Sequence, residues 1–215
     1  MAIVADGMGG HLAGEVASKI AVETIYQELD PYVEKAGNIN ELKYVLEEAI
    51  FRANDIVYHK SVQDERFRGM GTTIVTAIVC ENQILLGHIG DSRAYLIDRE
   101  KIEQLTNDHS LVNELVKSGQ ISEEDAIHYP RKNIITRALG TDESVKVDIE
   151  LVKWEQGQTL LLCTDGLTDE VSDQQILEVI IGSPIFSQKI VDELIAYANQ
   201  EEGKDNISII MIHHT

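Results

Sequence analysis

Four aspartates in tight turns constrain this chain most, because each turn adjoins an apolar run with the pattern of a β-strand. The four segments are VADGMGGH with Asp6, GHIGDSRAYL with Asp91, LLLCTDGLTDE with Asp165 and GKDNISIIMI with Asp205. Carboxylates that converge from strand ends suit magnesium, manganese or calcium, which prefer oxygen ligands. The pattern therefore predicts a hard-cation site assembled from turns that span nearly the whole chain.

The apolar periodicity between these turns predicts an α+β fold. Strands are expected from residue 2 onward and at 72–80, 84–89, 94–97, 101–105, 145–152, 159–163 and 207–212. Helices are expected at 13–29, after Asn40, and at 110–117, 122–128, 173–181 and 187–199. Short polar connections between the central strands indicate antiparallel hairpins. Helix pairs that alternate with groups of strands indicate helices covering the outer faces of packed sheets.

Composition narrows the class of partner. The chain has 215 residues, 43% of them hydrophobic, and a formal net charge of −19, which argues against unassisted binding to nucleic acid or anionic membranes. We expect Cys80 and Cys163 to be buried, reduced thiols, since each ends an apolar strand-like run. No apolar stretch of membrane-spanning length and no secretory signal is present, so we expect a soluble, cytoplasmic protein without membrane insertion.

Seven segments in order give the chain a resemblance to a known family. They are DGMGGH followed by AGEVAS, GMGTT, GDSRAYL, TNDHSLVNELV, NIITRALG, CTDGLTDE and GKDNIS. Together they resemble the bacterial branch of the metal-dependent, type 2C protein serine/threonine phosphatases, from residue 1 to about 212. The resemblance implies a four-layer α-β-β-α sandwich: two antiparallel sheets flanked by helix pairs. It also implies one catalytic domain over 1–215, with a flap over about 108–141 beside the active site.

The resemblance also implies a ligand set for two Mn²⁺ or Mg²⁺ ions. Asp6 matches the carboxylate that bridges the ions, and the carbonyl oxygen of Gly7 matches a ligand of one of them. Asp165 and Asp205 match further ligands of the pair. Asp91 matches an aspartate that binds a third, weaker metal or supports the acid–base histidine. Two adjacent cations can activate a water near neutral pH and clamp phosphoryl oxygens.

Some of these assignments have structural alternatives. His11 matches the family's general acid for the leaving alkoxide only under one alignment of the neighbouring glycines, and it could instead be a solvent-facing loop histidine. Asp91 could pair with Arg93. Asp205 could merely cap the turn before the last strand.

The chain departs from the family pattern at its start. The family's first motif precedes the DGMGGH strand and supplies a phosphate-gripping arginine, an acidic ligand of the second metal and two strands. This chain begins after that motif, so we expect an N-terminally incomplete domain that binds the second metal weakly. That arginine's role is transferred to none of Arg52, Arg66, Arg68 and Arg131.

The predicted function is Mn²⁺/Mg²⁺-dependent hydrolysis of phosphoserine and phosphothreonine in proteins, opposing a bacterial serine/threonine kinase. The alternatives are a catalytically weak, phosphatase-like regulatory or binding domain, and a calcium-binding structural domain. The calcium alternative fits less well because the chain has no contiguous calcium loop. Specific substrates, the physiological metal and the oligomeric state stay open.

Overall fold

The computed structural model describes residues 1–215 except 34–38, 128, 131–132, 184 and 202–204. Within this part the chain forms two four-stranded antiparallel sheets and one two-stranded sheet. The first sheet has the order β1 (Ala2–Val4), β4 (Ile74–Cys80), β5 (Gln83–Ile89) and β8 (Asp148–Lys153). The second has the order β10 (Ile209–His213), β9 (Thr159–Cys163), β6 (Arg93–Ile97) and β7 (Ile102–Gln104). The small sheet pairs β2 (Gly7–Met8) with β3 (Gly71–Thr72).

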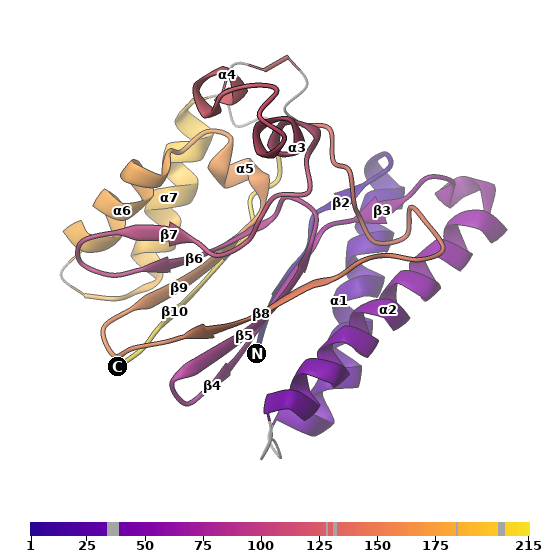
Figure 1. Cartoon of the computed structure of the whole chain (residues 1–215), viewed down its shortest axis with the longest axis horizontal. Helices are drawn as coiled ribbons and strands as arrows, with labels where there is room; N and C mark the ends of the chain where they lie inside the picture. Colours follow the sequence, from indigo (N-terminus) through magenta and orange to yellow (C-terminus); the bar gives the residue numbers. More distant parts are fainter. Residues whose placement is uncertain (34–38, 128, 131–132, 184, 202–204) are drawn as a thin grey trace.

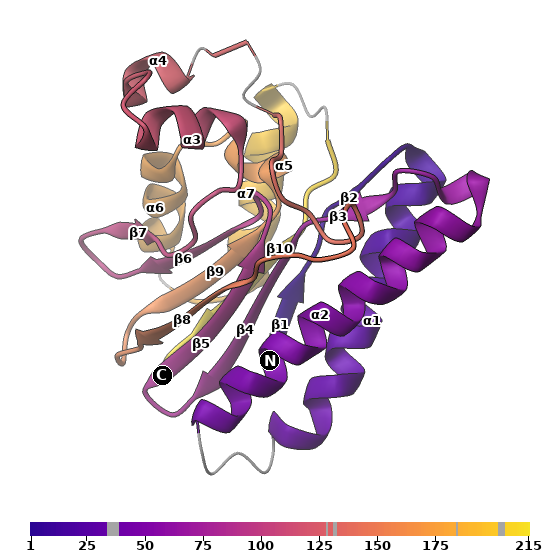
Figure 2. The ribbon, with the colours of Figure 1, turned by 45° about the vertical axis from the view of Figure 1, so that its right-hand side comes forward.

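Helices cover the outer faces of the two large sheets. The pair α1 (His11–Val33) and α2 (Ile39–Gln63) packs on the first sheet, and α6 (Asp173–Gly182) and α7 (Gln188–Glu201) pack on the second (Figures 1 and 2). Short helices α3 (Leu111–Lys117) and α4 (Glu123–Ile127) lie beyond one end of the sheets, near α5 (Asp165–Thr168) (Figure 1). A 3₁₀ turn, Glu65–Phe67, follows α2.

Strand alternation builds three apolar layers. In β4, Ile74 and Ile78 face the α1–α2 pair, whereas Val75 and Ala77 face the other sheet. In β9 the residues likewise alternate, with one set between the sheets and the other against α6 and α7. Successive side chains on a strand point to opposite faces, so both faces of each sheet are buried. The predicted four-layer α-β-β-α sandwich is confirmed.

The predicted elements are largely correct, but several boundaries differ, and three short elements, β2, the 3₁₀ turn and α5, were not predicted. A strand was expected from residue 145, but β8 begins at Asp148. Val145 and Val147 instead pack from a loop against the core under α1 and α2, so their apolar pattern reflects burial without strand pairing. The short helix α5 was not predicted, because four residues are too few to show a helical period.

The register of the sheets places the aspartate turns together. Val4 pairs with Val75 and Ile74 pairs with Ile89, so β1 ends where β5 ends. In the second sheet Cys163 pairs with both Arg93 and Ile209, so the end of β9 meets the starts of β6 and β10. The turns that follow or precede these residues carry the four aspartates. Within the described residues, no helix has the length and apolar character needed to cross a membrane.

Candidate metal centre

Asp6 lies at the end of β1, where two buried threonines bind its backbone. The Asp6 N–H donates to the hydroxyl of Thr73 at 2.9 Å, and the Asp6 carbonyl accepts from the Thr73 N–H and the Thr72 hydroxyl, each at 2.8 Å. All of the backbone polar groups of Asp6 are thus hydrogen-bonded to Thr72 of β3 or to Thr73, the residue between β3 and β4. Its carboxylate faces the negative charges of Asp165, Asp205 and Asp91.

Burial and mutual repulsion raise the pKa values of three of these carboxyl groups, Asp6, Asp91 and Asp165. Burial, followed by the charge of Asp165, a hydrogen bond with the Asp165 side chain, and the charges of Asp205 and Asp91, raises the pKa of Asp6 to about 8. Burial and the charge of Asp165 raise the pKa of Asp91 to about 7, and burial also raises the pKa of Asp165. Such carboxylates are unstable as free anions, and a bound dication would favour their ionised forms.

One oxygen in the cluster has no hydrogen-bond partner in the part of the chain that the structure describes. Oδ1 of Asp165 is buried and forms no hydrogen bond among the described residues. Buried acceptors are rarely left unpaired, so an unpaired carboxylate oxygen beside other carboxylates fits a cation ligand. The donor set, which consists of carboxylate and carbonyl oxygens, fits Mn²⁺ or Mg²⁺.

Asp205 lies beside the turn of Asp165. A Cβ on Gly166 would come within 2.3 Å of the Asn206 carbonyl oxygen, so these two turns are in contact because residue 166 is glycine. One oxygen of Asp205 accepts from the Asn206 N–H at 2.7 Å. This is the turn-capping contact that the sequence analysis gave as the alternative to metal binding. This contact uses one of its two carboxylate oxygens and is compatible with a second role for the other.

Asp91 does not form the alternative pair with Arg93. The Arg93 guanidinium instead binds Asp108, with Nη2 2.7 Å and Nε 3.0 Å from Oδ2, and donates from Nη1 to the Tyr95 hydroxyl at 3.0 Å. Asp108 lies fifteen residues beyond Arg93, at the start of the segment predicted to be a flap. Sequence proximity therefore pointed to the wrong partner, and Asp91 stays available at the centre.

Gly7 and His11 follow Asp6 in the DGMGGH loop. A Cβ on Gly7 would lie 2.0 Å from the carbonyl oxygen of Gly14, so only glycine lets β2 approach α1 this closely. The loop turns at Gly9 and Gly10, which have φ angles of 106° and 90°. His11 begins α1, and its side chain lies outside the described residues, so the general-acid assignment stays a prediction.

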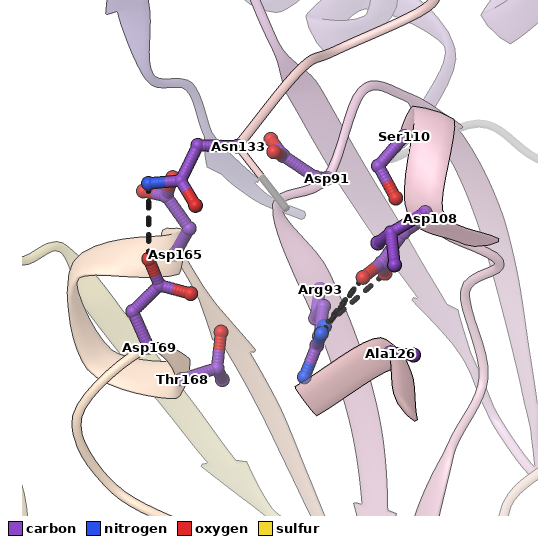
Figure 3. Close-up of a pocket in the computed structure, with 10 residues that line it drawn as sticks. Asp91, Arg93, Asp108, Ser110, Ala126, Asn133, Asp165, Thr168 and Asp169 are labelled. Atoms are coloured by element: carbon purple, nitrogen blue, oxygen red, sulfur yellow. Dashed lines mark hydrogen bonds and ion pairs between the residues drawn. The ribbon is translucent and has the colours of Figure 1, made fainter. Parts of the chain in front are cut away.

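Cavities open on two sides of the aspartate cluster. One, of about 300 Å³, is lined by Asp91, Asp165, Arg93 and Asp108 and reaches α4; Figure 3 shows Asp165 and Asp169 facing Asp91 and Arg93 across it. The other, of about 750 Å³, is lined by residues that include Asp6 and Asp205. Both sides of the centre are therefore accessible to ions or to a substrate.

A second buried polar cluster adjoins the centre and was not predicted. His88 and His109 stack with ring centroids 4.9 Å apart, and one nitrogen from each ring and one oxygen of Asp148 lie within 4.8 Å of one another. The Gly90 N–H donates to Nδ1 of His109 at 3.0 Å, which leaves the proton on Nε2, 3.2 Å from Oδ2 of Asp148. Arg137 lies 3.5 Å from Oδ1 of Asp148.

This histidine cluster is unsuited to a metal. The ring nitrogens of His109 are both hydrogen-bonded, Nε2 of His88 contacts the Asn107 carbonyl oxygen at 3.1 Å, and Arg137 supplies a positive charge. Its role is structural: it joins β5, β8 and the start of the flap segment to Gly90, the residue before Asp91. The local sequence around His109, Asn-Asp-His-Ser at 107–110, does not predict that its side chain binds Gly90 and Asp148.

The fold and site define a class of protein: a four-layer sandwich in which strand ends of the two sheets bring together a cluster of aspartates suited to divalent cations. The sequence matches the protein phosphatase 2C family over residues 1–210, and the chain belongs to that family. It is 42% identical to the serine/threonine phosphatase stp of Listeria monocytogenes over 212 residues, which cover 98% of this chain and 82% of that protein. Protein phosphatase PhpP of Streptococcus pneumoniae is 39% identical over 213 residues, covering 99% and 85% of the two chains.

Solved structures agree with this assignment. Serine/threonine phosphatase Stp1 from Staphylococcus aureus superposes with a TM-score of 0.92 at 36% identity, covering 99% of this chain and 83% of that one. The catalytic domain of PstP in complex with 2 manganese ions superposes with a TM-score of 0.85 at 33% identity, covering 97% and 85%. The predicted family, the metal-dependent protein serine/threonine phosphatase class and the manganese or magnesium requirement are confirmed.

Proposed function

We propose that Asp6, Asp165 and Asp205, with the carbonyl oxygen of Gly7, hold a pair of Mn²⁺ or Mg²⁺ ions and that Asp91 binds a third or supports the general acid. The observation that carries this proposal is the buried group of mutually repelling carboxylates whose pKa values reach about 7 and about 8. The unpaired Oδ1 of Asp165 supports it. A bound cation would relieve both features.

The reaction is hydrolysis of phosphoserine and phosphothreonine in proteins. When bound, a pair of such ions supplies an activated water and stabilises negative charge on the phosphoryl group. Bound cations would keep Asp6 and Asp165 ionised despite their burial, so the positions of these two carboxylates would fix where that chemistry occurs. His11 donates a proton to the leaving alkoxide, for which a histidine with a pKa near neutrality is suited. The cavity beside Asp91 receives the phosphorylated side chain.

The arginine that lines the cavity beside Asp91 is already paired, and this should lower the affinity for phosphorylated substrates. Among the described residues that line this cavity, the positive charge is that of Arg93, and three hydrogen bonds hold it on Asp108. A guanidinium held in this way does not offer a bidentate contact to phosphate. We therefore expect a high KM for small phosphomonoesters. The pairing of Arg93 also favours a second candidate function, a phosphatase-like domain that binds phosphoproteins and turns them over slowly.

We further propose that residues 1–215 act as one catalytic domain, that 108–141 form a flap controlling substrate access, and that the substrates are cytoplasmic targets of a serine/threonine kinase. The free thiols of Cys80 and Cys163 are consistent with a reducing compartment. The position of Asp108, Ser110 and Asn133 along the cavity supports a role for the flap in substrate selection.

The test compares wild type with Asp6→Asn and with Glu178→Gln, an exposed acid on α6 that serves as a control. Hydrolysis of para-nitrophenyl phosphate and of a phosphothreonine peptide is measured against Mn²⁺ concentration. Loss of Mn²⁺-dependent turnover in Asp6→Asn alone supports the phosphatase. Peptide binding that persists in both variants, with no Mn²⁺-dependent turnover in wild type, would favour the binding domain.

A further inference from the structure

Two buried threonines connect the four aspartate-bearing turns in pairs. The hydroxyl of Thr73 accepts from the Asp6 N–H at 2.9 Å and lies 2.6 Å from the hydroxyl of Ser92, the residue after Asp91. Both hydroxyl-bearing residues are about 1% exposed. One side chain therefore connects the end of β1 to the turn between β5 and β6.

The packing around Thr73 strengthens this connection. A Cβ on Gly90, whose φ is 105°, would lie 2.6 Å from Cβ and Cγ2 of Thr73. The Asp91 turn thus rests directly on the Thr73 side chain, on one side through Gly90 and on the other through Ser92. A shift of Thr73 would move Asp6 and Asp91 relative to each other.

Thr164 makes the equivalent connection in the second sheet. Its hydroxyl donates to the Asn206 carbonyl at 3.2 Å and accepts from the Ser208 N–H at 3.0 Å. Thr164 is the N-cap residue of α5, yet its side chain makes no capping bond to that helix. A threonine at this position usually caps its own helix, so its hydroxyl has been diverted to the turn that carries Asp205.

We propose that Thr73 and Thr164 are positioning residues of the metal centre: Thr73 fixes the turn of Asp6 against that of Asp91, and Thr164 fixes the turn of Asp165 against that of Asp205. The inference rests on the metal-ligand roles proposed above. Neither hydroxyl is assigned to a metal or a substrate. Each acts through the aspartates, whose spacing decides how tightly the ions bind.

The chain offers a matched control three residues beyond Thr73, which directly precedes β4. Thr76 in β4 is fully buried, and its hydroxyl has no hydrogen-bond partner among the described residues. Thr76→Val therefore makes the same chemical change as Thr73→Val and Thr164→Val without removing a hydrogen bond. Thr73→Ser and Thr164→Ser keep the hydroxyls and serve as rescue variants.

The experiment measures Mn²⁺ binding to the purified full chain by calorimetry, together with the Mn²⁺ concentration that half-activates phosphatase activity. Thr73→Val and Thr164→Val should each weaken Mn²⁺ binding roughly tenfold, a typical effect for residues that orient metal ligands. The half-activating Mn²⁺ concentration should rise by a similar factor, while kcat at saturating Mn²⁺ changes less. The serine variants should bind within about threefold of wild type and Thr76→Val within about twofold.

Two outcomes would overturn the inference: wild-type Mn²⁺ affinity in both valine variants, or an equal loss of affinity in Thr76→Val, which would indicate general damage to β4. Should a valine variant fail to fold, its serine counterpart decides, because a serine variant that folds but binds Mn²⁺ tenfold more weakly would also contradict a role for the hydroxyl. Asp6→Asn distinguishes a failure of the positioning role of the threonines from a failure of the proposed ligand set. Wild-type Mn²⁺ binding in Asp6→Asn would instead overturn the proposed ligand set itself.

Discussion

The aspartate cluster and the neighbouring histidine cluster are two partly buried polar groups with opposite electrostatic balance. In the histidine cluster, His109 donates to Asp148 and accepts from the Gly90 N–H, and Arg137 neutralises the carboxylate. In the aspartate cluster, like charges face one another and Oδ1 of Asp165 has no partner in the described part of the chain. The first cluster is complete without a ligand; the second is not.

The pKa values express the same difference. Burial opposes ionisation of Asp148, yet the hydrogen bond from His109 leaves its pKa below the usual value. Burial and neighbouring carboxylates instead raise the pKa of Asp6 to about 8. Buried charge is tolerated when it is paired, so the comparison separates a structural cluster from a site that needs a cation.

The largest expected effect comes from removing one charge of the aspartate cluster. Asp165→Asn should lower Mn²⁺-dependent kcat/KM by roughly a thousandfold, about 4 kcal/mol, because it removes a proposed ligand of the metal pair. In EDTA the same variant should unfold at a higher temperature than wild type, since a buried repulsive charge is gone. Steady-state kinetics and thermal unfolding test both parts; normal turnover, or a lower unfolding temperature in EDTA, would contradict the comparison.

The next effect comes from breaking the histidine cluster. His109→Leu leaves the Gly90 N–H without its acceptor and Asp148 without its donor, so the free energy of unfolding should fall by about 2–3 kcal/mol. Urea unfolding in EDTA measures this loss. His59→Leu, at an exposed histidine of α2, is the control. A loss that appears only when Mn²⁺ is present would assign the histidines to the metal site instead.

The extent to which Mn²⁺ stabilises the folded protein should depend on pH if the aspartate cluster, and not the histidine cluster, binds the ion. Because the folded-state pKa values of Asp6 and Asp91 are raised from 3.8 to about 8 and about 7, the metal-free folded state keeps protons that the unfolded state releases. Stability from these groups is present at low pH and is lost as the pH rises through those values, by up to about 1.4 kcal/mol per proton per pH unit.

Mn²⁺ must displace the same protons, so its stabilising effect should grow as the pH rises from about 6 to about 8. The measurement is the difference in unfolding temperature between Mn²⁺ and EDTA across this range. Asp6→Asn should flatten the dependence. A wild-type difference that stays constant with pH would show that these carboxylates do not hold the ion.

The smallest effect is expected at the edge of the histidine cluster. Arg137 is 37% exposed in its side chain and lies 3.5 Å from Asp148, so Arg137→Gln should cost no more than about 1 kcal/mol of unfolding free energy. Mn²⁺ affinity should be unchanged. Urea unfolding and calorimetry check the two statements, and a tenfold loss of Mn²⁺ affinity would connect Arg137 to the metal centre.

The fold was predictable because it depends on periodic burial. Alternation in strands such as β4 and the apolar stripe of α2 identify the layers, and short connections identify the antiparallel pairs. Boundaries were less predictable where burial occurs without pairing, as at Val145 and Val147. The predicted general-acid role of His11 stays a prediction, because its side chain lies outside the described residues.

Much of the site was predictable from its motifs, but its internal contacts were not. The aspartate turns are local features, and the structure brings them together as expected. The partners of Arg93, Thr164 and His109 lie between 15 and 44 residues away, at Asp108, Ser208 and Asp148. Nothing in the neighbouring sequence specifies such contacts, because the packing of the two sheets decides them.

Crystals soaked in Mn²⁺ at about pH 8, measured at the manganese absorption edge, would show directly which of the two clusters binds the ion. We expect anomalous density between Asp6 and Asp165, with a weaker peak near Asp91, and none between His88, His109 and Asp148. Manganese bound at the histidine cluster, with the aspartate cluster empty, would contradict it.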